Sequence, residues 1–514
     1  MPTADHRVNR AATGVSGTIV RSKGQDVDGR ARPLADLGAA RRSLSPDQIA
    51  LLVAVTLVGA ALYRARPESA GSATVAAVGL AFLAVVAWRI WLIIVSGPPV
   101  VPPALPPGQP TVWPRYTILA ALHDEAAIVD QLVRRLSRID YPADRLQGLL
   151  VLEAHDKSTL AAALSVPRPP WLEVVVVPPG GPLTKPRALN YALIQATGDL
   201  LTVYDAEDEP HPLQLREAAE RFAADPAGRL ACLQAPLRIR RRSGSGGSAF
   251  FDRQFAAEYA ALFETTLPGM ARLGLPFPLG GTSNHFRTEA LRAVGGWDAW
   301  NVTEDADLGF RLWRSGWRLG VIARPTWEAP PGPLEHWLPQ RTRWLKGHMQ
   351  TFGVHTRRAW ELGPRGLLAL VMSLGAGLAS AAIHGPSLAW VSATVLVATA
   401  AGLPPETSHL ALSVLVLGAA SSWLSCLIGA RRAGVPYGPA DMIAAPAYWS
   451  MLSLAFAHAA WRLIREPFAW DKTRHSPDAV PSPEPGQALA EAALDGMASL
   501  RLSADHAAAP QPVS

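Results

Sequence analysis

The stretch Asn301-Val302-Thr303-Glu304-Asp305-Ala306-Asp307-Leu308-Gly309 places three carboxylates within four residues, directly ahead of an apolar run with helical character. Such acids can serve solubility alone, and Thr303 can cap the helix with the acids near the positive end of its dipole. Two further elements change this interpretation. The acidic cluster 204–208 follows the apolar run 200–203, and the downstream stretch 340–344 reads Gln-Arg-Thr-Arg-Trp. An acid at a strand end, an acid at a helix start and paired arginines are together typical of one site.

Residues 115–345 alternate short apolar runs with amphipathic stretches. This alternation predicts an α/β domain built on a parallel sheet with covering helices. Polar clusters 123–125, 153–156 and 205–208 each follow a predicted strand, so all three are expected to face one crevice at the carboxyl ends of the strands. The predicted elements are strands at residues 116–122, 148–152, 172–177 and 200–203 and a helix at residues 126–138.

The composition indicates a membrane protein. The chain is 49% hydrophobic and only 18% charged, which is too apolar for a purely soluble enzyme. Uncharged or nearly uncharged runs predict about six spans, at residues 49–63, 70–95, 367–383, 388–403, 410–430 and 443–463. The predicted organisation is a disordered basic arm (1–44), a transmembrane hairpin (45–97), a catalytic domain (115–360), a C-terminal bundle of about four spans (365–465) and a disordered tail (476–514).

Charge sets the expected orientation. Six spans put both termini on one side, and the basic residues of the arm and of positions 462–474 place that side in the cytoplasm. The eight Lys and Arg of residues 1–48 are interpreted as a membrane flank, so no nucleic-acid partner is expected. Arg431-Arg432 would then lie outside, unless residues 434–447 are re-entrant or interfacial. Cys232 and Cys426 support neither a disulfide framework nor a metal site.

Residues 115–360 resemble the catalytic domain of processive family 2 glycosyltransferases, the cellulose synthase superfamily. The C-terminal Pro467-Phe468-Ala469-Trp470-Asp471-Lys472-Thr473 is similar to a segment that closes many bacterial members. The resemblance implies a Rossmann-like nucleotide-sugar-binding domain of the GT-A type, cytoplasmic and inserted between spans of a multi-pass inner-membrane protein. The motifs that carry it, in order, are Leu122-His123-Asp124-Glu125, Glu153-Ala154-His155-Asp156, Thr184-Lys185-Pro186-Arg187-Ala188-Leu189-Asn190, Asp205-Ala206-Glu207, Gly280-Gly281-Thr282-Ser283-Asn284, Thr303-Glu304-Asp305 and Gln340-Arg341-Thr342-Arg343-Trp344.

The Asp205-Ala206-Glu207 motif is the expected metal site. The two phosphates of a nucleotide diphosphate sugar need a hard divalent cation, Mg²⁺ or Mn²⁺, and such cations take carboxylate oxygens. The family usually has Asp-x-Asp here, and the longer Glu207 can still reach. Asp208 is interpreted as a helix-start acid that needs no function.

The Thr303-Glu304-Asp305 motif is expected to supply the catalytic base. Transfer with inversion needs a group that takes the proton of the attacking acceptor hydroxyl. The resemblance gives this role to Asp305 and makes Glu304 a positioning group.

The stretch 340–344 is expected to bind the diphosphate and the acceptor. Arginine matches phosphate oxygens with two parallel donors, so Arg341 and Arg343 are the predicted diphosphate contacts. Trp344 offers a flat apolar face for a sugar ring, and Gln340 belongs to the same motif. The alternative is an amphipathic interfacial helix at a membrane surface.

The remaining candidates concern the donor. Asp156 resembles the early Asp near the nucleotide base, with Glu153 as its competitor. Asp124 either lies nearby or caps the following helix, and Lys185 either binds phosphate or is a surface lysine. His285 and His348 stand at no metal spacing and are expected to be structural or to line the acceptor site.

The predicted function is transfer of a sugar, from UDP-glucose or a related donor, to a growing β-linked exopolysaccharide, with export through the spans as a further expectation. One alternative is addition of a single sugar to a lipid-linked acceptor. Another is a catalytically silent membrane receptor or assembly protein of the same fold. A periplasmic or regulatory partner subunit is compatible with each.

Overall fold

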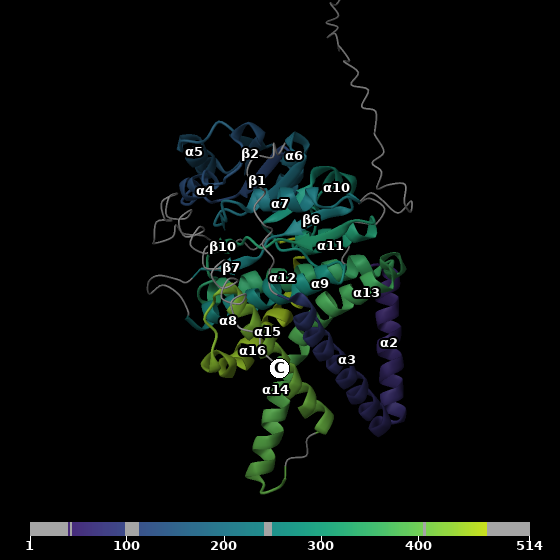
Figure 1. The fold of residues 1–514 in the computed structure, drawn as a ribbon. Helices are drawn as coiled ribbons and strands as arrows, with labels where there is room; N and C mark the ends of the chain where they lie inside the picture. The colour runs from purple at the N-terminus through teal and green to yellow at the C-terminus, as the bar shows by residue number, and fades with distance from the viewer. Residues whose placement is uncertain (1–39, 42–43, 98–112, 241–248, 405–407, 470–514) are drawn as a thin grey trace, which may run out of the picture.

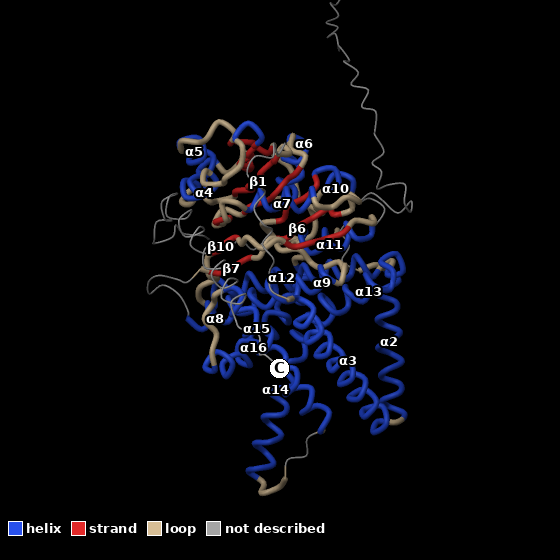
Figure 2. Tube along the Cα trace, in the orientation of Figure 1, coloured by secondary structure: helices blue, strands red, loops and turns tan. Residues whose placement is uncertain are grey.

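The computed structural model describes residues 40–41, 44–97, 113–240, 249–404 and 408–469. An α/β domain lies above a layer of helices, from which long apolar helices extend away (Figure 1). All strands lie in the α/β half, and the lower half is helical (Figure 2). Most of the predicted basic arm and the whole predicted tail fall outside the described residues.

A seven-stranded sheet forms the centre of the α/β domain, with the order β3-β2-β1-β4-β8-β6-β9. The first four strands in sequence are parallel to one another, as predicted. The prediction of a parallel sheet is wrong beyond them, because β8 runs antiparallel to both β4 and β6, so the sheet is mixed. The strands are β1 (Tyr116–Leu122), β2 (Leu146–Glu153), β3 (Leu172–Val177), β4 (Leu200–Tyr204), β6 (Leu230–Gln234), β8 (Asn284–Arg287) and β9 (Arg318–Val321).

The central strands are buried on both faces, which explains their near-continuous apolar sequence. Alternate residues of β1 enter two different cores: Ile118 and Ala120 pack with one set of helices, whereas Leu119 packs with the other. The first core takes residues of α4 (Val129–Leu136), α5 (Lys157–Ser165) and α7 (Gln214–Ala223), and the second takes those of α6 (Lys185–Gln195) and α10 (Thr288–Ala293).

A second layer lies beneath the seven-stranded sheet and covers that side of the α/β domain. It contains a three-stranded sheet with the order β5-β10-β7 and several helices. The bounds are β5 (Glu209–Pro210), β7 (Leu237–Ile239), β10 (Thr326–Glu328), α8 (Ala249–Ala261), the π-helix η2 (Leu262–Thr266), α9 (Leu267–Arg272), α11 (Glu304–Arg314) and α12 (Leu334–Thr356).

Four helices of the described chain are long and apolar enough to cross a membrane: α2 (Pro46–Ala65), α3 (Pro67–Ser96), the helical stretch Ala359–Ala400 and α15 (His409–Ala433). The prediction of two spans at residues 367–383 and 388–403 is therefore wrong. Pro386 lies inside α14 (Ala376–Ala400) without ending it, and the preceding amide of Gly385 donates to Ser453 Oγ at 2.9 Å. Membrane helices tolerate proline when neighbouring groups satisfy the freed backbone.

The sixth predicted span, at residues 443–463, corresponds to α16 (Pro439–Arg465), whose two ends both contact the α/β half. At its start, Arg253 Nε donates to Asp441 Oδ1 at 2.6 Å. Directly after its end, Lys346 Nζ donates to Glu466 O at 3.0 Å. Both contacts are to helices of the layer beneath the sheet, and α16 is not among the helices of the described chain that are long and apolar enough to cross a membrane.

The C-terminal end of α15 also lies against the α/β half. Arg432 Nη1 donates to Ser96 Oγ at 2.8 Å and to Glu264 O at 2.6 Å. Ser96 ends α3, so α3 and α15 both run toward the domain. Counting residues 359–400 as one span would place Arg431-Arg432 on the same side as the start of α2, in agreement with the positive-inside rule.

Candidate active site

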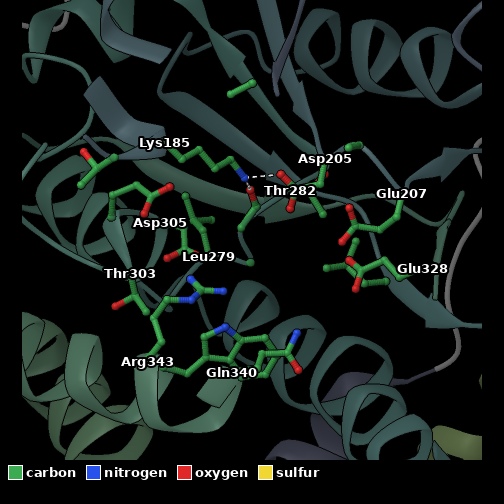
Figure 3. Close-up of a pocket in the computed structure, with 18 of the residues that line it drawn as sticks. Lys185, Asp205, Glu207, Leu279, Thr282, Thr303, Asp305, Glu328, Gln340 and Arg343 are labelled. Carbon is green, nitrogen blue, oxygen red and sulfur yellow. Dashed lines mark hydrogen bonds and ion pairs between the residues drawn. The ribbon is translucent and has the colours of Figure 1, made fainter. Parts of the chain in front are cut away.

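A cavity of about 360 Å³ lies between the carboxyl ends of the central strands and the helices α8, α11 and α12. Lys185, Asp205, Asp305 and Arg343 line it from α6, the end of β4, α11 and α12 respectively (Figure 3). The residues that the sequence grouped into one site thus do share one cavity.

Lys185 and Asp205 form an ion pair at the sheet side of the cavity. Asp205 directly follows β4, and Lys185 is the first residue of α6. Lys185 Nζ also donates to Gly281 O at 2.7 Å. Burial by itself lowers the pKa of Lys185, but the carboxylates of Asp205 and Glu304 raise it above its usual value, so Lys185 is charged.

Glu207 and Glu328 extend this acidic side, and their labelled side chains lie next to one another in Figure 3. Burial and the neighbouring carboxylates of Asp205, Glu207 and Asp208 raise the pKa of Glu328. Asp208 is fully buried, its pKa is raised for the same reasons, and its Oδ1 accepts no hydrogen bond from the described residues. Crowded carboxylates of this kind fit a hard divalent cation. No three potential ligands among the described residues meet at a ready-made metal centre, so the cation would share Asp205 and Glu207 with donor phosphates.

Glu304 and Asp305 begin α11 and face the cavity. The helix start is held by Asn301, whose Oδ1 accepts the Thr303 amide at 3.0 Å, while the Thr303 side chain makes no cap hydrogen bond. Burial raises the pKa of Asp305, against the effect of Lys185 and Arg343. Burial and the charge of Asp305 raise the pKa of Glu304 to about 8. The pair therefore places a strengthened base beside a protonated neighbour at neutral pH.

Asp307, the third acid of the stretch, faces away from this chemistry. Arg311 Nε donates to its Oδ2 at 2.6 Å, and His355 Nε2 lies 3.0 Å from its Oδ1. Burial opposes ionisation, but these partners lower the pKa of Asp307. Asp307 thus ties α11 to α12 and is structural.

Arg343, Trp344 and Gln340 project from α12 into the cavity. In Figure 3 the Arg343 side chain reaches toward Asp305, and Gln340 lies at the lower wall. Arg343 Nη1 donates to Val302 O at 3.4 Å, directly before the catalytic motif. The Arg343 guanidinium therefore lies close to the start of α11, where Glu304 and Asp305 face the cavity.

Arg341 is engaged differently from the prediction. Its guanidinium donates to both carboxylate oxygens of Glu258 at 2.9 and 2.5 Å and to Tyr448 OH at 3.0 Å. It also lies 4.7 Å from the ring centroids of Phe255 and Trp344. This arrangement joins α12 to α8 and α16, so Arg343 is the better placed of the two arginines to bind a diphosphate.

The predicted nucleotide contacts separate into two groups. Glu153 lines the cavity, where Arg187 Nη1 donates to both of its oxygens at 2.9 Å. Asp156 caps α5 through the Thr159 amide and accepts the Asp124 amide at 2.5 Å. Burial raises the pKa of Asp156, but these hydrogen bonds lower it overall. Neither Asp156 nor Asp124 lines the cavity, and His123, Glu125 and His155 line that end instead.

Several lining residues were absent from the sequence-based site: Glu258 and Tyr259 of α8, Leu262 and Phe263 of η2, and Glu328 of β10. None stands in a motif of spaced polar residues, so only the fold could bring them to the cavity. Of the two histidines, His285 is in the core, with Tyr116 OH 2.7 Å from its Nδ1, whereas His348 lines the cavity.

The central strand β4 thus ends in carboxylates and faces a buried acid at a helix start and an arginine, in a domain of the GT-A type. The chain belongs to glycosyl transferase family group 2, whose sequence profile matches residues 200–460. Its relatives include a beta-monoglucosyldiacylglycerol synthase and a cellulose synthase catalytic subunit.

The beta-monoglucosyldiacylglycerol synthase of Synechocystis is 30% identical over 49% of this chain and 51% of its own length. The cellulose synthase 1 catalytic subunit of Komagataeibacter xylinus is 27% identical over 48% of this chain and 32% of its own length. The matches thus span about half, or less, of these relatives. Among solved structures, the mannosyltransferase PcManGT from Pyrobaculum calidifontis, in complex with GDP-Man and Mn²⁺, aligns with a TM-score of 0.45 at 20% identity, over 76% of this chain and 98% of that one.

Proposed function

We propose that the protein transfers a sugar, with inversion, from a nucleotide diphosphate sugar to a hydroxyl group of an acceptor held at the membrane. The observation that carries this proposal is the meeting of Lys185, Asp205, Asp305 and Arg343 in one cavity. These four side chains supply a base and the charges that a diphosphate leaving group requires.

The chemistry follows from their positions. Asp305 takes the proton from the acceptor hydroxyl while its oxygen forms a bond to the anomeric carbon. The bond between that carbon and the diphosphate oxygen breaks on the opposite face, and the nucleoside diphosphate leaves with the electron pair. Arg343 and Lys185 stabilise the negative charge that develops on the diphosphate.

Asp205 and Glu207 are the proposed ligands of Mg²⁺ or Mn²⁺, which when bound neutralises the two phosphates. Lys185 is the protein cation that already contacts Asp205. It would keep the carboxylate oriented toward the cavity and add a donor for a phosphate oxygen.

The arrangement of the apolar helices favours a lipid-anchored acceptor. Helix α15 packs on α3 and α8, and α14 packs on α16, while the stacked rings of Trp423 and Trp449 join α15 to α16. Little of α2, α3, α14 or α15 is buried in the described chain. Helices that leave so much apolar surface to the bilayer give a lipid lateral access to the layer beneath the cavity. We place the protein in the inner membrane, with the α/β half in the cytoplasm.

The predicted exopolysaccharide synthase is the second candidate. It is supported by the cellulose synthase relatives and by the Gln340, Arg343 and Trp344 side chains on one wall of the cavity. It requires a conduit for the polymer, which a regulatory or periplasmic partner could help to form. UDP-glucose remains the favoured donor under both candidates.

The deciding test is product formation by purified protein in vesicles, with a panel of UDP- and GDP-sugars and Mg²⁺ or Mn²⁺. The proposal expects nucleotide release from one donor, with a product that organic solvent extracts. A product that grows until it is no longer extractable would favour the polymer. Absence of release with every donor would contradict both candidates and favour the catalytically silent alternative.

A further inference from the structure

The wall of the cavity formed by α12 carries more polar groups than the diphosphate chemistry uses. Gln340, Trp344 and His348 follow one another at intervals of four residues, so they lie along one face of the helix. All three line the cavity. His348 stands one turn beyond the motif that ends at Trp344.

Neighbouring side chains of α8 and α12 hold the aromatic ring of Trp344 in place. The Arg341 guanidinium lies 4.7 Å from its centroid, and the rings of Phe255 and Tyr259 lie 5.9 and 6.1 Å from it. An immobilised indole is a rigid apolar platform for a sugar-like ring.

Glu258 faces this platform from α8. Arg341 donates to both of its oxygens, and Tyr448 OH donates to Oε2 at 2.7 Å. The Glu258 side chain is nevertheless 39% exposed, whereas that of Arg341 is 7% exposed. Its carboxylate is thus fixed on one side and open toward the cavity, and a carboxylate oxygen retains lone pairs for hydroxyl donors.

His348 and Gln340 offer the complementary groups. Burial and the positive charge of Arg341 lower the pKa of His348 to about 4, so the imidazole is neutral and has one donor and one acceptor nitrogen. Neither nitrogen forms a hydrogen bond with the described residues. Gln340 Oε1 is buried and likewise has no hydrogen-bond partner in the described part of the chain. A buried oxygen without a partner is costly, so a ligand hydroxyl that donates to Gln340 Oε1 would satisfy it, and the half-buried His348 ring is available to the same ligand.

We propose that Glu258 and His348 bind the hydroxyl groups of a polyhydroxylated acceptor head that packs on Trp344. These two residues then determine acceptor specificity. The acceptor is then a lipid whose head is already a sugar, or a sugar chain end, and not a lipid with a single hydroxyl. The inference rests on the proposed function, because it names the acceptor of the same site.

The test compares acceptors in one preparation of full-length protein in phosphatidylglycerol vesicles, with the donor that supports turnover. The acceptors are glucosyl-dioleoylglycerol and dioleoylglycerol, which differ by the sugar head, and cellotetraose in solution. Wild type is expected to prefer a sugar-bearing acceptor by kcat/KM, and the favoured one of the two identifies lipid or polymer as the source of the head.

His348→Leu is expected to lower that preference by about 5- to 10-fold through the acceptor KM, because one neutral hydrogen bond is lost. The donor KM should not change in parallel with the acceptor KM. His348→Asn, which keeps a donor and an acceptor, should recover part of the preference, and Glu258→Gln should shift the acceptor KM in the same direction as His348→Leu. His336→Leu is the matched control, because His336 is exposed on the first turn of the same helix.

Equal preference in His348→Leu and His336→Leu would overturn the inference, as would a wild type that prefers dioleoylglycerol. A parallel change in the donor KM would show a structural effect and overturn it too. These outcomes differ from failure of the proposed function, in which wild type releases no nucleotide from any donor.

Discussion

At the residue scale, Glu304 beside Asp305 sets a pH dependence that can be measured. The pKa of Glu304 is raised to about 8, so it is protonated at pH 7 and ionises as the pH rises through that value. Its new negative charge would then repel the diphosphate donor. We expect the donor KM of wild type to rise above pH 8, and that of Glu304→Gln to stay flat, because glutamine mimics the protonated acid.

Below neutral pH the two proteins should behave alike. Burial raises the pKa of Asp305, so its ionised, active form is lost as the pH falls through a value above that of an ordinary aspartate. Profiles of kcat/KM between pH 4 and 9 report both limbs. A donor KM that differs between wild type and Glu304→Gln at pH 7 would contradict a protonated Glu304 at neutral pH.

Substitution of the two arginines of α12 should have different effects on turnover and on stability. Arg343→Met removes a charge aimed at the diphosphate and is expected to lower kcat about 100-fold or more, with little change in stability. Arg341→Met breaks the pair with Glu258 and the contact with Tyr448, so it should lower the free energy of unfolding by about 1–3 kcal/mol. Thermal unfolding in detergent and steady-state rates measure both quantities. The opposite assignment of effects would contradict the roles proposed for them.

The sequence identified the charged residues that gather at the cavity, because acids after strands and before helices follow simple topological rules. Asp205 and Asp305 are where these rules placed them. Glu258 escaped notice, and His348 stayed between a structural role and the acceptor site, since an isolated acid or histidine on a helix carries no signal of its direction. The same lack of directional information made Arg341 and Arg343 look equivalent.

At the element scale, the contact between α11 and α12 is tight enough to test with one methyl group. A Cβ on Gly347 would lie 2.3 Å from Thr303 Oγ1 and 2.5 Å from its Cγ2, directly before the catalytic Glu304 and Asp305. Gly347→Ala should therefore displace the start of α11 and lower kcat at least 10-fold. At an ordinary helix position the same change would raise the stability of the helix.

Gly377→Ala is the matched control, because a Cβ at this position of α14 meets nothing within 4 Å. Its rate should equal that of wild type, with unchanged or slightly raised thermal stability. If Gly347→Ala matched Gly377→Ala in kcat, the packing of α11 on α12 would not hold the base in place.

Strand prediction succeeded where apolar runs were long, as at β1 and β3, whose bounds agree with the prediction. It failed at β8 and in the small β5-β10-β7 sheet, whose strands are two to four residues long and carry polar residues. Strands so short have no readable period, so their pairing depends on tertiary contacts. The Gly385-Pro386 interruption in hydropathy similarly suggested a boundary that the helix does not have.

At the scale of the whole molecule, we propose that four helices cross the membrane and that α16 lies along its surface. Variants that add one cysteine, at Ser69, Glu335 or Glu466, can test this with a membrane-impermeant thiol reagent on intact spheroplasts. Wild type, which keeps Cys232 and Cys426, measures the background labelling. Only Ser69→Cys, in the first turn of α3 and close to its connection with α2, should react from outside. Glu466→Cys should become reactive only after lysis, as should Glu335→Cys. Labelling of Glu466→Cys from outside would mean that α16 crosses.

The central claim is that Asp305 acts as the catalytic base and that the other residues of the site bind the donor. The most direct measurement is made on Asp305→Asn: binding of UDP with Mn²⁺ by calorimetry, and sugar transfer with the preferred donor. We predict nucleotide affinity close to that of wild type and transfer reduced at least 1,000-fold. Transfer within 10-fold of wild type would contradict the claim, and loss of nucleotide binding would assign Asp305 to donor binding instead.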